Sequence, residues 1–439
     1  MKSGQNIAVI GTGISGLGAA YLLSQRHTVT LYESQSTPGG HARSVTTDVG
    51  QGPLVVDTGF IVFNRRNYPL LSGLFDHLQV PVAKSDMSFG VSVDHGWLEY
   101  GTRRPYHLFS QLENATRPEY WRMLRDIFRF NRLAPRYLEA SLEISLGDAL
   151  DEMDMGPWFR HYYLLAMGGA IWSLPLTQVY AFPARPFIQF FKNHGLLTVL
   201  DHPQWHTVRG GSQVYVRTLL NAFPHTLKLS TAVMSVRRTG TGVEVIDERG
   251  GQAEYDHVVL ACHSDQALRI IDAPTPDEAR ILGAIRYQPN VMILHTDTSF
   301  MPQRKAAWSS WNYLSEHRAR STYEGQQAVC LSYWMNNLQP LPTKTPILVT
   351  LNPSRRPAPE TILDQHQFAH PVFTREALMA QEDMNTIQGR DRLWFAGAWQ
   401  GYGFHEDGLK SAVDMARRFG VTPPWQPEAE KGPASPTAG

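Results

Sequence analysis

The chain has 439 residues, roughly three times the ~150 of one ordinary domain, which predicts two or more domains around a large apolar core. Forty Lys and Arg balance forty Asp and Glu, and 42% of the residues are hydrophobic, so a mainly disordered chain is excluded and the total charge indicates no nucleic-acid partner. With only two cysteines, Cys262 and Cys330, and no Cys/His cluster at metal spacing, the sequence favours a reducing, cytoplasmic location and predicts neither a disulfide framework nor a metal site.

The first predicted elements are a strand, a tight turn, a helix and a second strand. Residues 7–10 form a short apolar run, residues 15–24 are compatible with a helix, and residues 28–32 are rich in β-forming side chains. Lys2 is the only basic residue ahead of this apolar start, so a signal peptide is not indicated. The pattern predicts half of a βαβ unit.

Further strands are predicted at residues 229–236, 242–246 and 257–261, and we interpret them as a meander. Near the end of the sequence, residues 392–396 are typical of a buried strand, and the glycine-rich turn 397–407 leads into a predicted helix at 408–419. We find no stretch of about 18 uninterrupted apolar residues, so a membrane-spanning helix is not predicted.

These elements predict an α/β fold in which a Rossmann-like domain carries an inserted α+β substrate-binding domain. The inserted segments are rich in aromatic residues and proline. The tail has five prolines in 19 residues and is expected to be disordered. The expected boundaries are 1–75, 205–285 and 375–420 for the Rossmann-like domain, 76–204 and 286–374 for the inserted domain, and 421–439 for the tail.

A dinucleotide-binding loop follows the first predicted strand. Gly11, Gly13 and Gly16 have the GxGxxG spacing, and the loop opens the predicted helix. Gly11 permits the turn, Gly13 lets a pyrophosphate approach the backbone, and Gly16 lets the helix pack close to the sheet. Glu33 ends the second strand, where its carboxylate can accept hydrogen bonds from ribose hydroxyls. A phosphate on that ribose would be repelled, so NADP is disfavoured.

A second glycine turn bears on the choice between NAD and FAD. Gly39 and Gly40 again allow backbone to approach phosphate, followed by His41 and by Arg43, a cation for the phosphate or the ribityl region. Taken alone, such a turn is more often a surface loop. Together with Glu33 it favours FAD, because a simple NAD domain does not require it.

The sequence resembles the FAD-dependent amine oxidase and phytoene desaturase superfamily along most of its length. The resemblance rests on residues 11–16 with Glu33, Gly39-Gly40 with Arg43, and the segments Val56–Phe60, Trp205–Ser212, Val258–Cys262 and Phe395–Gly397 with Gly408. It implies an FAD-binding domain of amine oxidase type, with the closing turn and helix over the ribityl chain and flavin. A C-terminal helix that is merely packed is the alternative. The resemblance implies cofactor contacts at Gly11, Gly13, Ile14, Ser15, Gly16, Glu33, Gly40, His41, Arg43, Thr58, Gly59, Phe60, Val233, Gly397, Asp407, Gly408 and Leu409.

A narrower resemblance points toward lipids. Residues 399–410, 170–173 and 182–195 are similar to a bacterial flavoprotein subgroup related to the N-terminal part of plant cyclopropane fatty acid synthases. This association implies fatty-acyl substrates. The ring-rich segment 182–194 then lines an apolar tunnel or, alternatively, belongs to the core.

His405 and Glu406 are the catalytic candidates, because both lie in the closing turn expected to face the flavin. A histidine titrates near neutral pH and can act as a base. His405 stands about where amine oxidases of the superfamily carry a cage tyrosine, which weakens that assignment. The closing turn also lacks the cysteine that tethers flavin in some relatives, so non-covalent FAD is expected. Alternatively, these residues form an ordinary helix start with Asp407 as its cap.

An arginine stripe is predicted on one helix, at spacings of three and four residues. We hypothesise peripheral contact with an anionic membrane through it. A solvated basic face, satisfied by acids from elsewhere, is the alternative. The stripe consists of Arg122, Arg125, Arg129, Arg132 and Arg136.

The sequence thus predicts an FAD-dependent oxidoreductase, an oxidase or desaturase, that acts on an apolar lipid by hydride transfer to flavin. Oxygen is the simplest acceptor, and a quinone is an alternative. A flavin amine oxidase producing hydrogen peroxide is one rival. A non-catalytic redox sensor, or a partner of a lipid-modifying methyltransferase, is another.

Overall fold

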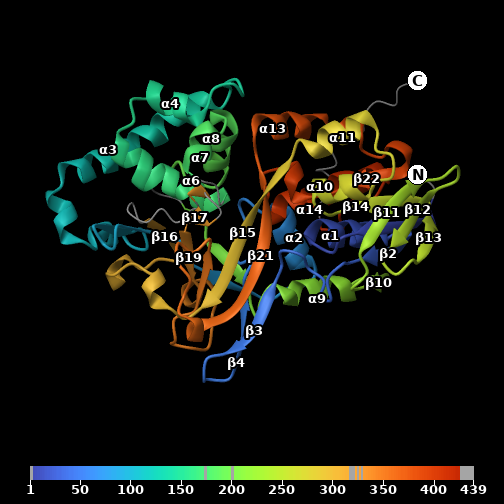
Figure 1. Cartoon of the computed structure of the whole chain (residues 1–439), viewed down its shortest axis with the longest axis horizontal. Helices are drawn as coiled ribbons and strands as arrows, with labels where there is room; N and C mark the ends of the chain where they lie inside the picture. Colours follow the sequence, from blue (N-terminus) through green and yellow to red (C-terminus); the bar gives the residue numbers. More distant parts are fainter. Residues whose placement is uncertain are drawn as a thin grey trace.

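A parallel sheet of five strands lies at the centre of one half of the molecule (Figure 1). The computed structural model describes residues 3–172, 176–198, 202–315, 322–323, 326–327 and 330–425. The strand order β10-β2-β1-β14-β22 brings together segments nearly four hundred residues apart, and every neighbouring pair is parallel. The strands are β1 (Asn6–Ile10), β2 (Thr28–Tyr32), β10 (Thr226–Lys228), β14 (His257–Leu260) and β22 (Leu393–Phe395).

The predicted strands at 7–10, 28–32 and 392–396 are confirmed, but the predicted meander is wrong in one strand. Residues 257–260 pair with β1 and β22 in the parallel sheet. Val258, Val259 and Leu260 are all fully buried, the unbroken apolar run typical of a parallel strand covered on both faces. The antiparallel meander consists of β11 (Val233–Arg238), β12 (Val243–Asp247) and β13 (Gln252–Tyr255).

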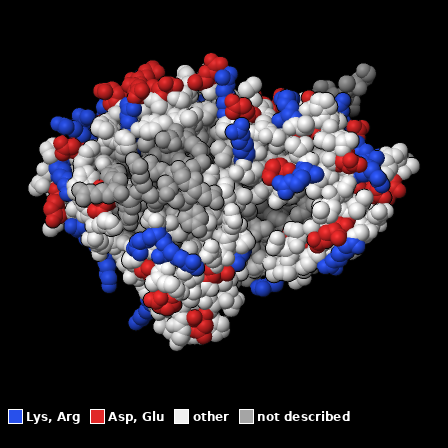
Figure 2. Space-filling view, in the orientation of Figure 1, with Lys and Arg blue, Asp and Glu red and all other residues white. Residues whose placement is uncertain are grey.

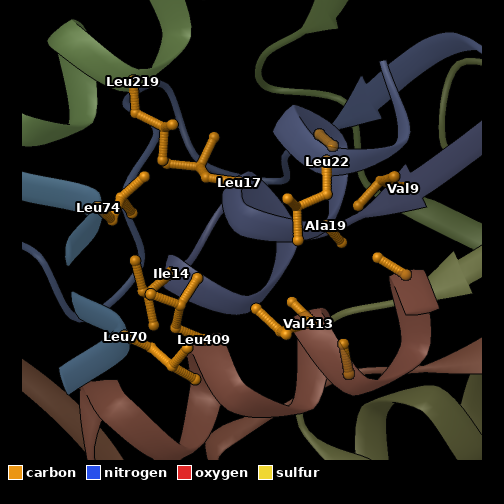
Figure 3. Close-up of a cluster of buried hydrophobic side chains, with 14 of the residues drawn as sticks. Val9, Ile14, Leu17, Ala19, Leu22, Leu70, Leu74, Leu219, Leu409 and Val413 are labelled. Atoms are coloured by element: carbon orange, nitrogen blue, oxygen red, sulfur yellow. The ribbon is translucent and has the colours of Figure 1, made fainter. Parts of the chain in front are cut away.

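Helix α1 (Ile14–Leu23) packs against α14 (His405–Arg418), so the first and last predicted helices touch (Figure 3). A Cβ on Gly18 would lie 2.7 Å from a methyl of Leu409, so glycine lets the two helices approach closely. Leu17, Leu409 and Val413 are buried in this core. Helices α2 (Pro69–His77) and α9 (Gln213–Asn221) complete it.

A seven-stranded sheet forms the centre of the other half, in the order β21-β15-β20-β19-β16-β7-β8. Its long strands β15 (Arg286–His295) and β21 (Ile362–Val372) run down the middle of Figure 1. The remaining strands are β7 (Phe89–Val93), β8 (Leu98–Gly101), β16 (Trp311–Ser315), β19 (Cys330–Trp334) and β20 (Leu348–Leu351).

A group of helices covers this sheet at the left of Figure 1 and shares a core with β7, β16 and β19. These helices are α3 (Pro118–Leu133), α4 (Leu146–Glu152), α5 (Pro157–Phe159), α6 (Leu165–Trp172), α7 (Leu176–Ala181) and α8 (Ala184–Asn193). The other elements are α10 (Ser264–Ile270), α11 (Pro276–Gly283), α12 (Met335–Leu338), α13 (Arg375–Glu382), β3 (Ser44–Asp48), β4 (Pro53–Asp57), β5 (Phe63–Asn64), β6 (Val82–Ser85), β9 (Trp205–Val208), β17 (Thr322–Tyr323) and β18 (Gln326–Gln327).

The two sheets draw their strands from the ranges expected for the two domains. The packed chain extends past residue 421, where the tail was expected to begin: Val421 is buried, and the indole of Trp425 stacks on Tyr21 with ring centroids 6.0 Å apart. Residues 426–439 of that predicted tail lie outside the described residues. Over the described ranges, none of the helices has the length and hydropathy needed to cross a membrane.

Candidate active site

A cavity of about 1340 Å³ runs between the two halves of the molecule. This volume exceeds the ~300–1,000 Å³ of an ordinary small-ligand pocket, so it can hold an extended cofactor and a substrate together. Exposed Gln266 and Arg269 line one end, together with the glycine loop, and we call this the glycine-loop end. Exposed Arg103, Arg104 and Phe128 line the other, which we call the α3 end.

The start of helix α1 is built to receive an anion. Gly13, the N-cap residue, provides no side-chain cap, and the first turn carries no acidic residue. Gly13, Ile14 and Ser15 line the cavity, and a Cβ on Gly13 would meet nothing within 4 Å. The unpaired N–H groups and the helix dipole therefore face open space, which fits a pyrophosphate. Gly11 also lines the cavity, whereas Gly16 packs beneath the carbonyl of Gly11, as its predicted packing role requires.

Glu33 is held at the edge of the cavity by backbone donors. Its carboxylate accepts hydrogen bonds from the N–H of Thr12 at 3.1 Å and from the N–H of Gln35 at 2.9 Å. The Thr12 hydroxyl also donates to it, a contact that the GxGxxG pattern did not predict. Glu33 and Val233 both line the glycine-loop end, which suits the ribose and adenine of a dinucleotide.

The second glycine turn closes against the first. Gly40 has a φ of +55°, a backbone conformation that favours glycine, and a Cβ there would lie 3.1 Å from the Cα of Gly13. The N–H of Phe60 donates to the carbonyl of His41 at 2.7 Å, which brings residues 58–60 onto this turn. All of the predicted contacts Gly40, His41, Thr58, Gly59 and Phe60 line the cavity.

His41 and Arg43 differ from what the sequence predicted of a basic turn. Desolvation, with further contributions from His370 and His263, lowers the pKa of His41 well below its usual value, so the imidazole is neutral. Arg43 does not line the cavity. Its guanidinium instead pairs with Asp364 of β21 at 2.8 Å and donates to the hydroxyl of Thr58 at 3.0 Å. Arg43 therefore anchors the turn to β21, and the prediction of a direct cofactor contact is not borne out by this geometry.

The closing turn contributes Gly397 and His405 to the cavity, but the residues after His405 point elsewhere. Glu406 accepts hydrogen bonds from the N–H groups of Leu70 and Leu71, at 2.8 and 2.9 Å, at the start of α2. The prediction of a catalytic Glu406 is therefore corrected, because its carboxylate joins α14 to α2 outside the cavity lining.

Asp407, Gly408 and Leu409 also lie behind the cavity wall. Asp407 accepts a hydrogen bond from the N–H of Phe404 at 2.9 Å. Phe404 is the N-cap of α14 and Asp407 lies in its first turn, so the alternative interpretation, in which Asp407 is the cap, is wrong in position although the carboxylate does satisfy the helix start. A Cβ on Gly408 would lie 2.7 Å from the hydroxyl oxygen of Ser15, so glycine brings the starts of α1 and α14 together. Leu409 is fully buried in the core. The predicted direct contacts of these three residues become supporting roles.

His405 is partly buried beside Phe60 and Tyr215. Its ring stacks on Phe60 with centroids 3.8 Å apart, and the distance from Nε2 to the Tyr215 hydroxyl is 3.0 Å. Burial lowers the pKa of His405 to about 3, so the imidazole stays neutral at physiological pH. The expectation of a base that titrates near neutrality is therefore wrong. His405 presents a neutral hydrogen-bonded ring to the cavity.

The α3 end of the cavity is lined mainly by aromatic and aliphatic side chains. Phe190 of α8 stacks on His194 with centroids 3.8 Å apart and on Phe404 with centroids 5.0 Å apart. The other face of α8 carries Phe187 and Phe191 into the core, so the segment 182–194 serves both the cavity and the core. Lining residues that the predicted site did not include are Tyr68, Met167, Trp205, Trp311, Tyr333, Phe373, Tyr402 and Phe404. Two of them, Tyr402 and Phe404, had a local signal in the sequence, because they alternate with glycines in residues 401–404.

Acidic residues are scarce around the cavity. Only two line it within the described ranges, Glu33 at the glycine-loop end and Asp86 toward the α3 end. Burial acts to raise the pKa of Asp86, but hydrogen bonds from Ser88 and Ser310 outweigh it and lower that pKa. Asn337 donates to the same oxygen at 3.0 Å. These hydrogen bonds all reach one oxygen of the carboxylate, Oδ1.

Three features of the site are typical of a dinucleotide-dependent oxidoreductase. They are the uncapped helix start behind a GxGxxG loop, the acidic residue at the end of β2, and the long cavity with an apolar far end. The chain belongs to the family of flavin containing amine oxidoreductases, whose model matches residues 14–419. The cofactor of this family is FAD. The uncapped start of α1 and the open space at Gly13 fit that cofactor.

Known proteins with similar sequences or folds carry out different reactions. A Mycobacterium tuberculosis protein that bears the name of a flavin-containing monoamine oxidase, AofH, is 25% identical over 290 residues, which are 63% of this chain and 61% of that protein. The match thus spans about three fifths of that relative. Two solved structures share the fold at low identity. They are a conjugated-linoleic-acid-producing fatty acid isomerase from P. acnes (TM-score 0.66, 16% identity, 95% of this chain and 99% of that chain) and a putrescine oxidase bound to putrescine (TM-score 0.67, 15% identity, 95% and 99%).

Proposed function

We propose that the protein oxidises or desaturates the acyl chain of an apolar lipid. Bound FAD would accept the hydride that such a reaction removes from the chain. The observation that carries this proposal is the lining of the α3 end, where aromatic and aliphatic side chains from α3, α6, α8 and the seven-stranded sheet surround one continuous space. The sequence resemblance to the flavoprotein subgroup related to plant cyclopropane fatty acid synthases supports the same substrate class.

The charge state of the cavity favours a neutral substrate. His405 and His194 have pKa values lowered by burial to about 3 and about 4, so both rings are uncharged at neutral pH. An ammonium group buried here would need a paired anion, and Asp86 already accepts hydrogen bonds from its neighbours. An acyl chain needs no such partner, and its burial is favourable by ~0.8 kcal/mol per CH₂.

His194 presents a neutral imidazole to the cavity, because burial lowers its pKa to about 4. Its Nδ1 lies 3.0 Å from the carbonyl of Phe190, which fixes the hydrogen on Nδ1 and leaves Nε2 with a lone pair. The ring lines the cavity between Phe190 and Tyr68. Within the proposed reaction we assign to His194 the role of a hydrogen-bond acceptor that positions the substrate, because a pKa of about 4 makes it, like His405, a poor base at neutral pH.

Anaerobic reduction of the bound flavin tests the proposal. Purified holoenzyme is mixed with unsaturated fatty acids, with detergent-dispersed phospholipids or with amines, and flavin absorbance is followed. We expect a lipid to bleach the flavin, and Met167→Trp to abolish the bleaching by filling the apolar space while FAD content stays unchanged. Bleaching by amines alone, or no bleaching by any lipid, would contradict the proposal.

An amine oxidase is the second candidate, favoured by the name of the mycobacterial relative. If an amine is the substrate, Asp86 is the carboxylate placed to pair with it, and Asp86→Asn should raise KM for amines by at least about tenfold. If the substrate is an acyl chain, the same variant should leave lipid turnover nearly unchanged. The two outcomes separate the candidates within one variant.

A further inference from the structure

We propose that the surface around the α3 end docks on an anionic lipid bilayer, so that acyl chains pass from the membrane directly into the cavity. We call this surface the α3 lip. It consists of the segment 103–112 and the exposed side of α3, including Tyr106, Leu112, Trp121, Phe128 and the arginines of that helix. The inference deepens the proposed function by naming the source of its substrate, and it is tested by a measurement that does not need turnover.

Helix α3 turns three different faces to three environments. Tyr120, Met123 and Phe130 are buried in the core. One step around the helix, Leu124, Ile127 and Asn131 line the cavity. Phe128 belongs both to the cavity lining and to the exposed surface, so the wall of the cavity continues outward along this helix without a break.

Large apolar side chains are exposed beside this opening. The exposed fractions are 61% for Phe128, 52% for Trp121, 62% for Tyr106 and 79% for Leu112. Together with Trp97, Met234 and Met379 they are the exposed large hydrophobics among the described residues, so most of this class gathers on one end of the molecule. Clustering of this kind marks an interaction surface rather than random exposure.

Positive charge surrounds these rings. Residues 103–136 contain eight arginines and three acidic residues, although the whole chain has no net charge. Asp126, a buried residue of α3 itself, pairs with Arg125 and Arg129. Arg122 and Arg132 are exposed and make no ion pair within the part of the chain that the structure describes. Figure 2 shows Lys and Arg atoms over the α3 end of the molecule, at its left.

An anionic bilayer is the partner that satisfies both features at once. Rings at the level of the headgroups enter the boundary with the acyl region, while neighbouring arginines contact lipid phosphates. The side-chain oxygen Oδ1 of Asn131 is buried without a hydrogen-bond partner among the described residues, on the cavity side of the same helix. It is placed to accept a hydrogen bond from a polar group of an entering lipid.

Vesicle co-sedimentation of the holoenzyme tests the proposal. Vesicles of phosphatidylcholine are compared with vesicles of equal parts phosphatidylcholine and phosphatidylglycerol, at low and high salt. We expect binding to the anionic vesicles only, weakened at least about tenfold by Arg122→Glu with Arg132→Glu and lost at high salt. The difference in tryptophan emission between the wild type and Trp121→Phe should shift to shorter wavelength on binding, because the chain has ten other tryptophans. Phe128→Ser should weaken binding without changing FAD content.

The matched control reverses the charge of two exposed arginines in the half that holds the parallel sheet, as Arg26→Glu with Arg217→Glu. This variant changes the net charge by the same amount and should leave binding intact. Equal binding to neutral vesicles, or equal loss in the control and the α3 variants, would overturn the docking proposal. Because detergent-dispersed lipid can still bleach the flavin in that case, failure of docking and failure of the proposed function are distinguishable.

Discussion

Gly13 and Gly16 lie one helical turn apart and differ in what a side chain would meet. Gly13 has φ −66° and ψ 178°, which any residue adopts, and its Cβ would enter open cavity. At Gly16 a Cβ would overlap the carbonyl oxygen of Gly11. We predict that Gly13→Val folds with an unchanged apo melting temperature but retains at least about tenfold less FAD. Gly16→Val should lower the free energy of unfolding by about 3 kcal/mol or more.

Thermal melts of the apo forms and the flavin absorbance of the purified variants check this pair. Both variants introduce the same side chain, so they differ only in what that side chain meets and in the backbone conformation of its position, extended at Gly13 and helical at Gly16. If Gly13→Val retains FAD like the wild type, the loop does not hold the pyrophosphate. If Gly16→Val melts like the wild type, the close contact at Gly11 is not required by the fold.

Sequence analysis misassigned residues whose role depends on a partner that is distant in the sequence. The spacing of Arg43 after Gly40 predicted a phosphate contact, but Asp364, more than three hundred residues later, takes the guanidinium. His405 was expected to titrate near neutrality, and only its burial between Phe60 and Tyr215 shows that it does not. The glycines were predictable because their roles are local to one turn. The partners of charged side chains were not.

At the scale of elements, Glu406 connects α14 with the start of α2. Burial raises the pKa of Glu406 from 4.5 to about 7, against the effect of its two backbone hydrogen bonds. Between these pH values the folded protein holds a proton that the unfolded chain has released, so rising pH lowers the free energy of unfolding across this window. The full effect is on the order of 3 kcal/mol.

We predict that Glu406→Gln removes this slope. Chemical denaturation at a series of pH values should show the wild type losing stability relative to the variant between about pH 4.5 and 7, with a constant difference below that window. Asp57, whose pKa burial also raises, is present in both proteins and cancels in the comparison, whereas the charge of Asp407 contributes to the raised pKa of Glu406. Parallel curves would show that Glu406 does not titrate in this range.

The predicted elements agree with the structure where the local pattern of apolar residues alone determines the element. Strands at 7–10 and 28–32 and the first helix are within a residue or two of their observed bounds. The segment 257–260 was placed in the wrong sheet, because the pairing partners of an apolar run are set by topology and not by local sequence. Residues 229–232 fall outside β11, where Ser230 has a φ of +47° and turns the chain.

At the scale of the whole molecule, the cavity could not be predicted from the sequence. Its lining comes from α1, the closing turn, α3, α8 and both long strands of the seven-stranded sheet, which are far apart in the sequence. The division into two sets of segments was readable, because the aromatic stretches differ in composition from the glycine-punctuated ones. How these sets enclose a common space depends on packing between them.

Because one cavity runs between the two halves, we predict that the protein contacts both the adenosine half and the flavin half of FAD. Because Glu33 and Val233 line the end suited to the adenosine half, FMN lacks the part that they would hold. The free energy of unfolding should rise by about 1.4 kcal/mol for each tenfold increase of free FAD above its Kd, and FMN should give no comparable rise. Thermal melts of apoprotein titrated with each cofactor measure this difference. Denaturation of the holoenzyme should release all of the flavin, since the closing turn carries no cysteine. Equal stabilisation by FMN would place the binding energy on the flavin alone and remove the assigned role of the glycine-loop end.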